Sequence, residues 1–213
     1  MEGSSYEHWT AEASGSHSYL YPVVKCLLAD LPKNSIVLDM GCGNGSFISL
    51  FSQTGWKLYG TDFSTAGIEV AKKHFPNISF FLADSQANIS KLKEQTGDVD
   101  VVISTEVIEH VYDPRAFLRN AYEFLSPNGT LVITTPYHGY LKNVMLAVAN
   151  KMDHHYTALR DHGHIKFFSR NTLTKVLEET GFHVEQFRGA GRFPYLWKSM
   201  VLVASKPLRA NRS

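Results

Sequence analysis

The sequence predicts a doubly wound α/β fold built on a mainly parallel, seven-stranded sheet. Short apolar runs rich in β-branched residues alternate with segments of helical periodicity, which is typical of βαβ units with right-handed crossovers. The last two strand patterns have no helix between them, so they predict an antiparallel hairpin at one edge of the sheet. A length of 213 residues, with 44% hydrophobic and 19% charged residues, suits one well-buried domain.

Each element follows from its local pattern. The expected strands cover 35–40, 57–62, 78–83, 99–104, 130–135, 182–189 and 199–205. The expected helices cover 19–29, 46–54, 64–74, 88–94, 113–125 and 170–180. We expect residues 1–17 to be a flexible lead-in, 18–208 a single domain and 209–213 a tail, with an insertion at about 137–168 that covers the substrate.

A glycine-rich turn follows the first strand. Asp39 ends an apolar run, Gly41, Gly43 and Gly45 follow at intervals of two, and a helical pattern begins near Ser46. Glycine permits sharp turns and leaves no Cβ between the backbone and a ligand. A strand, such a turn and a helix N-terminus form a nucleotide-sized site. The third glycine comes one position earlier than in the dinucleotide-binding pattern, which argues against a pyrophosphate ligand.

Acidic residues also end the next two strands. Asp62 follows the second strand and Asp84 the third, where carboxylates can accept hydrogen bonds from a bound nucleoside. A capping role for the helix that follows each acid is the alternative interpretation.

The glycine turn and these acids together resemble the class I S-adenosylmethionine-dependent methyltransferases, whose Rossmann-like sheet ends in an antiparallel hairpin. The resemblance implies that Asp39 orients the methionine end of S-adenosylmethionine, Asp62 binds the ribose hydroxyls, Phe63 flanks the adenine and Asp84 contacts its amino group. The cofactor-binding residues implied in this way are Asp39, Gly41, Cys42, Gly43, Gly45, Asp62, Phe63, Asp84, Ser85 and Thr105.

Two carboxylates and an imidazole follow the fourth strand. Glu106, Glu109 and His110 are spaced i, i+3 and i+4, which predicts one helical turn with all three on one face. These groups can hold Mg²⁺, Mn²⁺ or Zn²⁺, which would lower the pKa of an acceptor hydroxyl. Without a metal, His110 or Glu109 could act as the general base. His164 is the candidate fourth ligand, and its alternative role is to hold its loop by hydrogen bonds.

The motif Glu-x-x-Glu-His resembles that of the ubiquinone-biosynthesis O-methyltransferases, and the lead-in and the segment 161–169 are similar to theirs. It also resembles the motif of small-RNA 2′-O-methyltransferases. The first resemblance implies O-methylation of a small hydroxylated acceptor, such as a catechol, quinol, sugar or lipid. A net charge of +1 without a basic stripe argues against stable nucleic-acid binding. A nicotinamide-dependent oxidoreductase and an inactive binding module are further alternatives.

The insertion carries an apolar stripe. Leu141, Val144, Met145 and Val148 are spaced for one helix face. This face either packs on the core or on a second subunit, or it covers a hydrophobic acceptor or contacts a membrane surface. Both a monomer and a homodimer are compatible with it. Two cysteines, and no apolar run near the roughly 20 residues that span a bilayer, lead us to expect a cytoplasmic protein.

Overall fold

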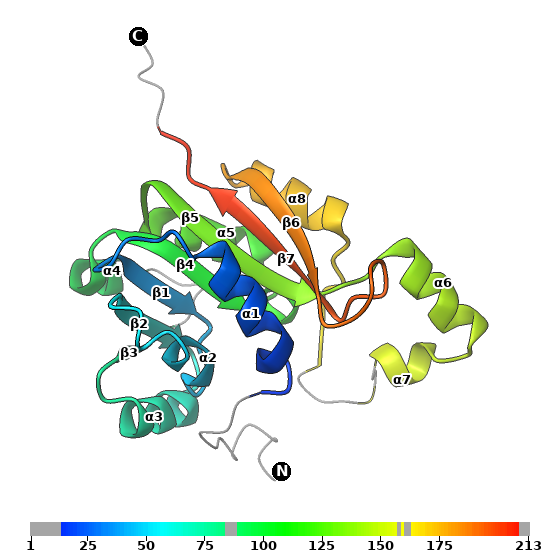
Figure 1. Ribbon diagram of the computed structural model, residues 1–213, viewed down its shortest axis with the longest axis horizontal. Helices are drawn as coiled ribbons and strands as arrows, with labels where there is room; N and C mark the ends of the chain where they lie inside the picture. The colour runs from blue at the N-terminus through cyan, green and yellow to red at the C-terminus, as the bar shows by residue number, and fades with distance from the viewer. Residues whose placement is uncertain (1–13, 84–88, 157–158, 160–162, 209–213) are drawn as a thin grey trace.

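The fold is a seven-stranded sheet with the order β3-β2-β1-β4-β5-β7-β6 (Figure 1). The computed structural model describes residues 14–83, 89–156, 159 and 163–208. The strands are β1 (Ile36–Met40), β2 (Lys57–Asp62), β3 (Ser79–Leu82), β4 (Val99–Thr105), β5 (Leu125–Pro136), β6 (His183–Ala190) and β7 (Ser199–Ser205). Strands β1 to β5 pair in parallel, and β7 runs antiparallel to both β5 and β6. The predicted sheet and its closing hairpin are therefore confirmed.

Helices cover both faces of this sheet. They are α1 (His17–Leu27), α2 (Ser46–Ser49), α3 (Thr65–His74), α4 (Ser90–Thr96), α5 (Pro114–Phe124), α6 (Tyr140–Val148), α7 (Met152–Tyr156) and α8 (Arg170–Glu179). Residues of α4, α5 and α8 share one apolar cluster with the sheet, and residues of α1, α2 and α3 share the other. Neighbouring strand residues such as Val37 and Leu38 enter opposite clusters, as the two-residue period of a strand requires.

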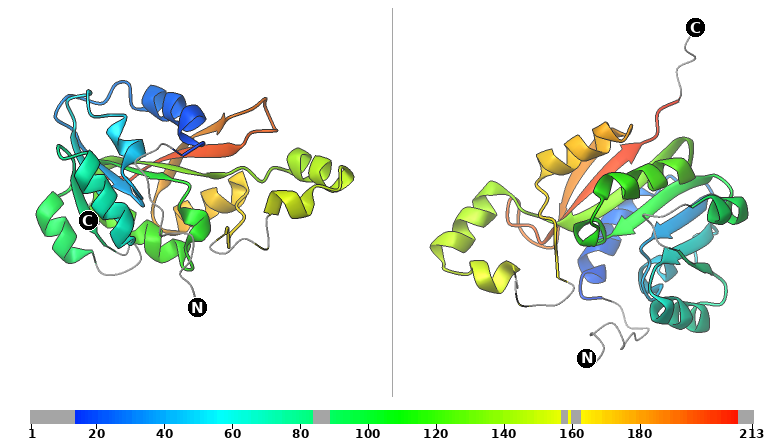
Figure 2. Two further views of the ribbon diagram at one scale, coloured as in Figure 1. Left: turned by 90° about the horizontal axis from the view of Figure 1, so that it is seen from below. Right: turned by 180° about the vertical axis from the view of Figure 1, so that it is seen from behind.

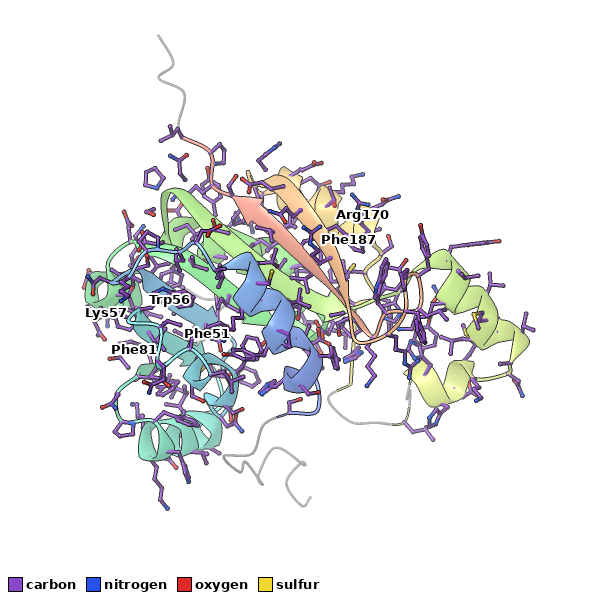
Figure 3. The ribbon with its side chains drawn as sticks, in the orientation of Figure 1. Phe51, Trp56, Lys57, Phe81, Arg170 and Phe187 are labelled. Atoms are coloured by element: carbon purple, nitrogen blue, oxygen red, sulfur yellow. The ribbon has the colours of Figure 1, made fainter. Side chains whose placement is uncertain are left out.

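Ring contacts extend both clusters (Figure 3). Beside α2, the rings of Phe51 and Trp56 stack with their centroids 5.6 Å apart. At the start of α8, the guanidinium of Arg170 lies over the ring of Phe187 in β6, 4.8 Å from its centroid. These contacts anchor α2 and the start of α8 to the sheet.

The predicted helix over 46–54 is too long, because α2 ends at Ser49. The backbone continues with i−3 hydrogen bonds, from Leu50 N to the Phe47 carbonyl and from Phe51 N to the Ile48 carbonyl. The Ser52 hydroxyl donates to the Ser49 carbonyl at 2.8 Å. Such hydroxyls compete with helix hydrogen bonds for the carbonyls, so the helix tightens into turns.

The segment after β5 extends beyond the body of the domain as α6 and α7, in both views of Figure 2. The apolar stripe on α6 faces solvent: the exposed fraction is 48% for Leu141, 39% for Val144, 49% for Met145 and 84% for Val148. The stripe therefore does not pack on the core of this chain, and the alternatives that it covers an acceptor, meets a membrane or contacts a second subunit stay predictions. Among the described residues, no helix is long and apolar enough to cross a bilayer.

Candidate functional site

The turn after β1 has a backbone that only glycine adopts easily. Gly41, Gly43 and Gly45 have φ angles of +89°, +53° and +74°. A Cβ on Gly41 would lie 2.5 Å from Val107 Cγ2, and one on Gly45 would lie 2.6 Å from Phe80 Cζ. Both backbone conformation and close packing therefore exclude larger residues at these two positions. The backbone amides of Gly41 and Cys42 donate to the Thr61 carbonyl, at 2.8 and 2.9 Å, and tie the turn to the end of β2.

Asp62 joins this turn to the segment after β2. Its carboxylate accepts from the amide of Gly43 and from that of Ser64, both at 2.8 Å. The N-cap of α3 is Ser64, whose hydroxyl accepts from Gly67 N at 3.1 Å. The N-cap of α3 is thus Ser64 and not Asp62, as the alternative interpretation would require. Asp62 instead links the glycine turn to the start of the segment that leads into α3.

Asp39 is a buried acid at the end of β1. It is 0% exposed, and neither carboxylate oxygen has a partner among the described residues. Burial and the nearby charge of Asp62 raise the pKa of Asp39 to about 8. A buried ionised group without a partner is costly, so a cationic ligand group would complete this site. S-adenosylmethionine, which carries a sulfonium and an ammonium group, fits this requirement.

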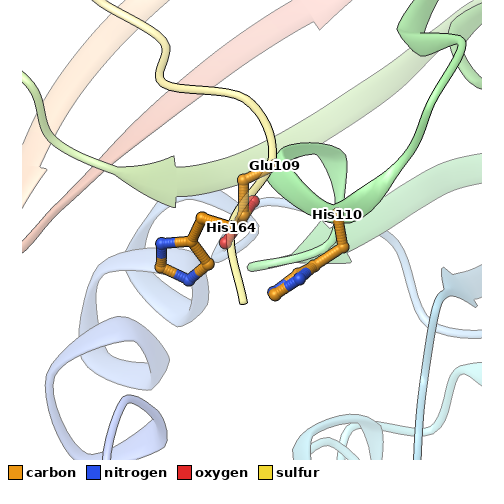
Figure 4. A group of neighbouring side chains, drawn as sticks. All are labelled: Glu109, His110 and His164. Carbon is orange, nitrogen blue, oxygen red and sulfur yellow. The ribbon is translucent and has the colours of Figure 1, made fainter. Parts of the chain in front are cut away.

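A second group of side chains lies where β4 ends. The 3₁₀ turn η2 (Ile108–His110) presents Glu109 and His110, and the last part of the insertion brings His164 beside them (Figure 4). Ligand atoms of all three lie within 4.8 Å of one another, and the two imidazole rings are 4.9 Å apart. The amides of Ile165 and Lys166 both donate to the Glu109 carbonyl, at 2.9 and 3.0 Å, and this pairing holds His164 in place.

The Glu109 side chain is buried, and only one of its carboxylate oxygens has a hydrogen-bond partner among the described residues. One oxygen accepts from the Thr135 hydroxyl at 2.9 Å, and the other has no partner among the described residues. Glu109 is 0% exposed. Burial and the charge of Glu106 raise the pKa of the Glu109 carboxyl well above its usual range. The His110 ring donates from Nδ1 to the Gly163 carbonyl at 3.2 Å.

The prediction that one helical turn presents Glu106, Glu109 and His110 together is wrong. Glu106 has a φ of +56° and precedes η2, so its side chain leaves in a different direction. It accepts from the hydroxyl of Thr134 at 2.8 Å and from that of Ser199 at 3.0 Å. Removal from water raises the pKa of Glu106 to about 7. Glu106 therefore lies outside the three-residue group that could hold a metal.

Comparison with known proteins assigns the family. A family model described as a methyltransferase domain matches residues 13–186. The chain belongs to the methyltransferase domain family. The prediction of a class I S-adenosylmethionine-dependent methyltransferase is therefore confirmed at the level of the family and the fold.

Curated relatives of the methyltransferase domain include several O-methyltransferases. The chain is 30% identical over 156 residues to the mitochondrial ubiquinone biosynthesis O-methyltransferase of Schizosaccharomyces pombe, with 72% of this chain and 57% of that protein covered. It is 27% identical over 153 residues to the ubiquinone biosynthesis O-methyltransferase of Azorhizobium caulinodans, with 72% and 60% covered. A probable S-adenosylmethionine-dependent methyltransferase of Mycolicibacterium smegmatis is 28% identical, with 73% and 56% covered. The chain thus spans little more than half the length of these relatives.

Solved methyltransferase structures share the fold. A putative methyltransferase from Bacillus halodurans superposes with a TM-score of 0.66 at 16% identity, covering 87% of this chain and 98% of that one. The magnesium protoporphyrin IX methyltransferase of Synechocystis, solved with bound SAH, gives a TM-score of 0.65 at 20% identity, covering 88% and 82%.

The other residues of this methyltransferase domain that are predicted to bind the cofactor lie in different surroundings. Cys42 is buried in the turn, Thr105 ends β4 and is half-buried, and Phe63 is 67% exposed beside Asp62. Asp84 and Ser85 lie outside the described residues. Their assigned contacts with the cofactor stay predictions.

Several residues that position the two glutamates were not expected from the sequence. Thr134 and Thr135 lie near the end of β5, and Ser199 begins β7. The Ser199 hydroxyl also hydrogen-bonds the Tyr19 hydroxyl of α1 at 3.2 Å. The two threonines could have been predicted to lie near the site, because they stand at the carboxyl end of a predicted strand. The position of Ser199 could not, because it depends on how the hairpin folds back.

Proposed function

We propose that this domain is an S-adenosylmethionine-dependent O-methyltransferase for a small hydroxylated acceptor. The observation that carries the proposal is Glu109, which is buried beside His110 and His164 with one oxygen that no described residue engages. The relatives named as ubiquinone biosynthesis O-methyltransferases support oxygen as the accepting atom. A catechol or quinol is the acceptor class that their names suggest.

The chemistry requires an oxygen nucleophile and correct alignment. The acceptor hydroxyl gives its proton to the Glu109 carboxylate or to His110 while its oxygen attacks the cofactor methyl group in line with the breaking bond. The carbon–sulfur bond breaks, the carbon–oxygen bond forms, and S-adenosylhomocysteine leaves with the electron pair on sulfur. In its ionised form, a carboxylate with a raised pKa is a stronger base than an ordinary one, so Glu109 would remove the proton from the acceptor once its own carboxyl has ionised.

A divalent cation is compatible with the same three side chains. Glu109, His110 and His164 offer one carboxylate and two imidazoles whose ligand atoms lie within 4.8 Å of one another, a donor set suited to Mg²⁺, Mn²⁺ or Zn²⁺. A bound cation would lower the pKa of the acceptor hydroxyl. Glu106 would stay outside the ligand set and hold the ends of β5 and β7 together.

Transfer of a labelled methyl group to a panel of catechols, quinols and sugars tests the proposal. Glu109→Gln should lower kcat by about 10²–10⁴-fold, as expected for loss of a general base or ligand. Its affinity for S-adenosylhomocysteine should change less than about threefold. Glu106→Gln is the matched variant, and we expect a smaller loss because its contacts are with Thr134 and Ser199.

Repeating the assay with EDTA separates the two mechanisms. Loss of activity that Mg²⁺, Mn²⁺ or Zn²⁺ restores, together with a matching loss in His164→Ala, supports the cation. Full activity in EDTA and in His164→Ala assigns proton removal to Glu109 or His110 alone. Methyl transfer only to nitrogen acceptors would overturn the proposal of an O-methyltransferase.

A further inference from the structure

A cavity of about 460 Å³ lies between α6 and the loop that joins β6 to β7. Four of its lining residues are cationic: Lys142, Lys151, Arg192 and Lys198. The other lining residues are five apolar side chains and one histidine, and no carboxylate is among them. Within the described part of the chain, no salt bridge involves these four cations. The cavity thus concentrates positive charge that no acidic side chain of its own lining balances.

One of these cations is built into the fold. The Lys142 side chain is 7% exposed, and its ammonium donates to the carbonyls of Tyr137 and Trp197 at 2.8 and 3.2 Å. Burial and the charge of Arg192 lower the pKa of Lys142 to about 8, and the charge of Glu106, which is not part of the lining, offsets this only in part. A nearby anion would favour the charged form of Lys142 and reduce its repulsion from Arg192.

The apolar part of the lining is unusually exposed. Met145 of α6 is 49% exposed, and Phe193 of the hairpin loop is 81% exposed. Both side chains line the cavity that holds the cations. Apolar walls with a few charged groups are typical of sites for ligands that combine an apolar body with one polar end.

We propose that this cavity binds a small amphiphilic anion, a phosphate or carboxylate group carried on an apolar chain or ring. The cations hold the anionic group, and Met145 and Phe193 cover the apolar part. One lining residue links the cavity to Glu106, because Lys198 directly precedes Ser199, whose hydroxyl donates to Glu106 at 3.0 Å. This inference concerns binding and does not require methyl transfer.

Calorimetric titration of the full chain with monomeric octyl phosphate tests the proposal, with inorganic phosphate and octyltrimethylammonium as comparison ligands. We expect saturable one-to-one binding of octyl phosphate, and binding at least tenfold weaker for each comparison ligand. Lys151→Gln with Arg192→Gln should weaken octyl phosphate at least tenfold. Phe193→Ser should weaken it severalfold, since its ring is exposed and its loss should leave the fold intact.

The matched control is Lys72→Gln with Lys73→Gln, which removes two exposed charges from α3, at the other end of the molecule from α6. Octyl phosphate should bind this variant with unchanged affinity. Thermal melts of the same samples show whether a variant still folds, and titration with S-adenosylhomocysteine shows whether its cofactor site is intact. A loss of octyl phosphate binding alone then reports on this cavity. Equal affinity in both double variants would overturn the proposal. So would binding to phosphatidylglycerol vesicles without binding of monomeric octyl phosphate, which would indicate a membrane surface instead.

Discussion

The edge of the sheet formed by Asp39, the turn 41–45 and Asp62, the cofactor edge, differs from the insertion at 137–168 in how it is built. At the cofactor edge, Asp39 is 0% exposed, Asp62 is 8% exposed, and the turn between them has a backbone that requires glycine. In the insertion, Val148 is 84% exposed and the cations of the adjoining cavity lie among apolar side chains. The first site is determined by backbone geometry, which tolerates few substitutions. Apart from the buried Lys142, the second is determined mostly by side chains that face solvent, which can change without disturbing the fold.

Asp62→Asn should produce the largest change at the cofactor edge. The substitution removes the charge that accepts from two backbone amides, and the predicted contact with the ribose is lost with it. Hydrogen bonds to charged groups are worth about 1.5–3 kcal/mol each, so we expect affinity for S-adenosylhomocysteine to fall by about 100-fold or more. Calorimetric titration measures this effect.

Asp100→Asn is the matched control for that experiment. Asp100 also accepts from a backbone amide, that of Ile36 at 2.8 Å, but at the start of β1 instead of its carboxyl end. We expect this variant to lose stability while its affinity for S-adenosylhomocysteine stays the same. Equal losses of affinity in the two variants would show that Asp62 acts through folding alone.

Gly41→Ala should destabilise the turn by about 2–4 kcal/mol, from backbone strain and from overpacking. The added Cβ meets the side chain of Val107 at 2.5 Å, and that side chain can be shortened. Val107→Ala in the same chain should therefore restore part of the lost stability, measured by denaturant unfolding. If the double variant is no more stable than Gly41→Ala, the strain at a φ of +89° accounts for the whole effect.

The sheet and the cofactor edge could be predicted because both follow from local patterns. The side chains of strand β1 alternate between two apolar clusters, and each glycine of the turn has a positive φ angle that favours glycine. Because parallel strands place their carboxyl ends at one edge, Asp39 and Asp62 had to be neighbours. The antiparallel pairing of β6 and β7 followed from the absence of a helix between them.

The glutamate group could be predicted only in part, because it depends on contacts between distant segments. Helical spacing placed Glu106 with Glu109, but a φ of +56° at Glu106 turns its side chain toward Thr134 and Ser199. His164 reaches Glu109 through backbone pairing across more than fifty residues. The length of α2 depends on serine hydroxyls that compete for its backbone carbonyls, and the cationic cavity depends on how the β6–β7 hairpin folds back. Hydrophobic periodicity in the sequence predicts neither feature.

The buried carboxylate of Asp39 predicts a pH dependence of stability. Its pKa is raised to about 8 in the folded chain, above the ordinary value of 3.8, so the folded state binds the proton more tightly than the unfolded state does. Its contribution to stability is therefore greatest at low pH and is lost as pH rises from about 4 through 8. At pH 8, Asp39→Asn should therefore melt at a temperature at least about 2–4 °C above that of the wild type. This is the change in melting temperature that a shift of one pKa unit causes in a domain of this size, about 2–4 °C.

The difference in melting temperature between the two proteins should shrink as pH falls toward 5, because both then carry a neutral side chain at position 39. Glu106 and Glu109 titrate in both proteins and cancel in this comparison. A difference that stays constant from pH 5 to pH 8 would contradict a raised pKa at Asp39. Affinity of the wild type for S-adenosylmethionine should increase over the same range, since the ligand's positive charge favours the ionised carboxylate.

The smallest effect is expected at the insertion. Val148→Ser removes an apolar side chain that is 84% exposed, so the free energy of unfolding should change by less than about 0.5 kcal/mol. The matched change in the core is Val102→Ser, at a side chain that is 0% exposed in β4, where loss of apolar burial and an unpaired hydroxyl together should cost several kcal/mol. Urea unfolding of both variants measures the contrast.

A large loss of stability in Val148→Ser would mean that the α6 stripe is covered in solution. A melting temperature of the wild type that rises with protein concentration would then identify a second copy of the chain as its cover. In that case the exposed stripe of the insertion would be an interface, and the insertion would be as constrained in sequence as the cofactor edge.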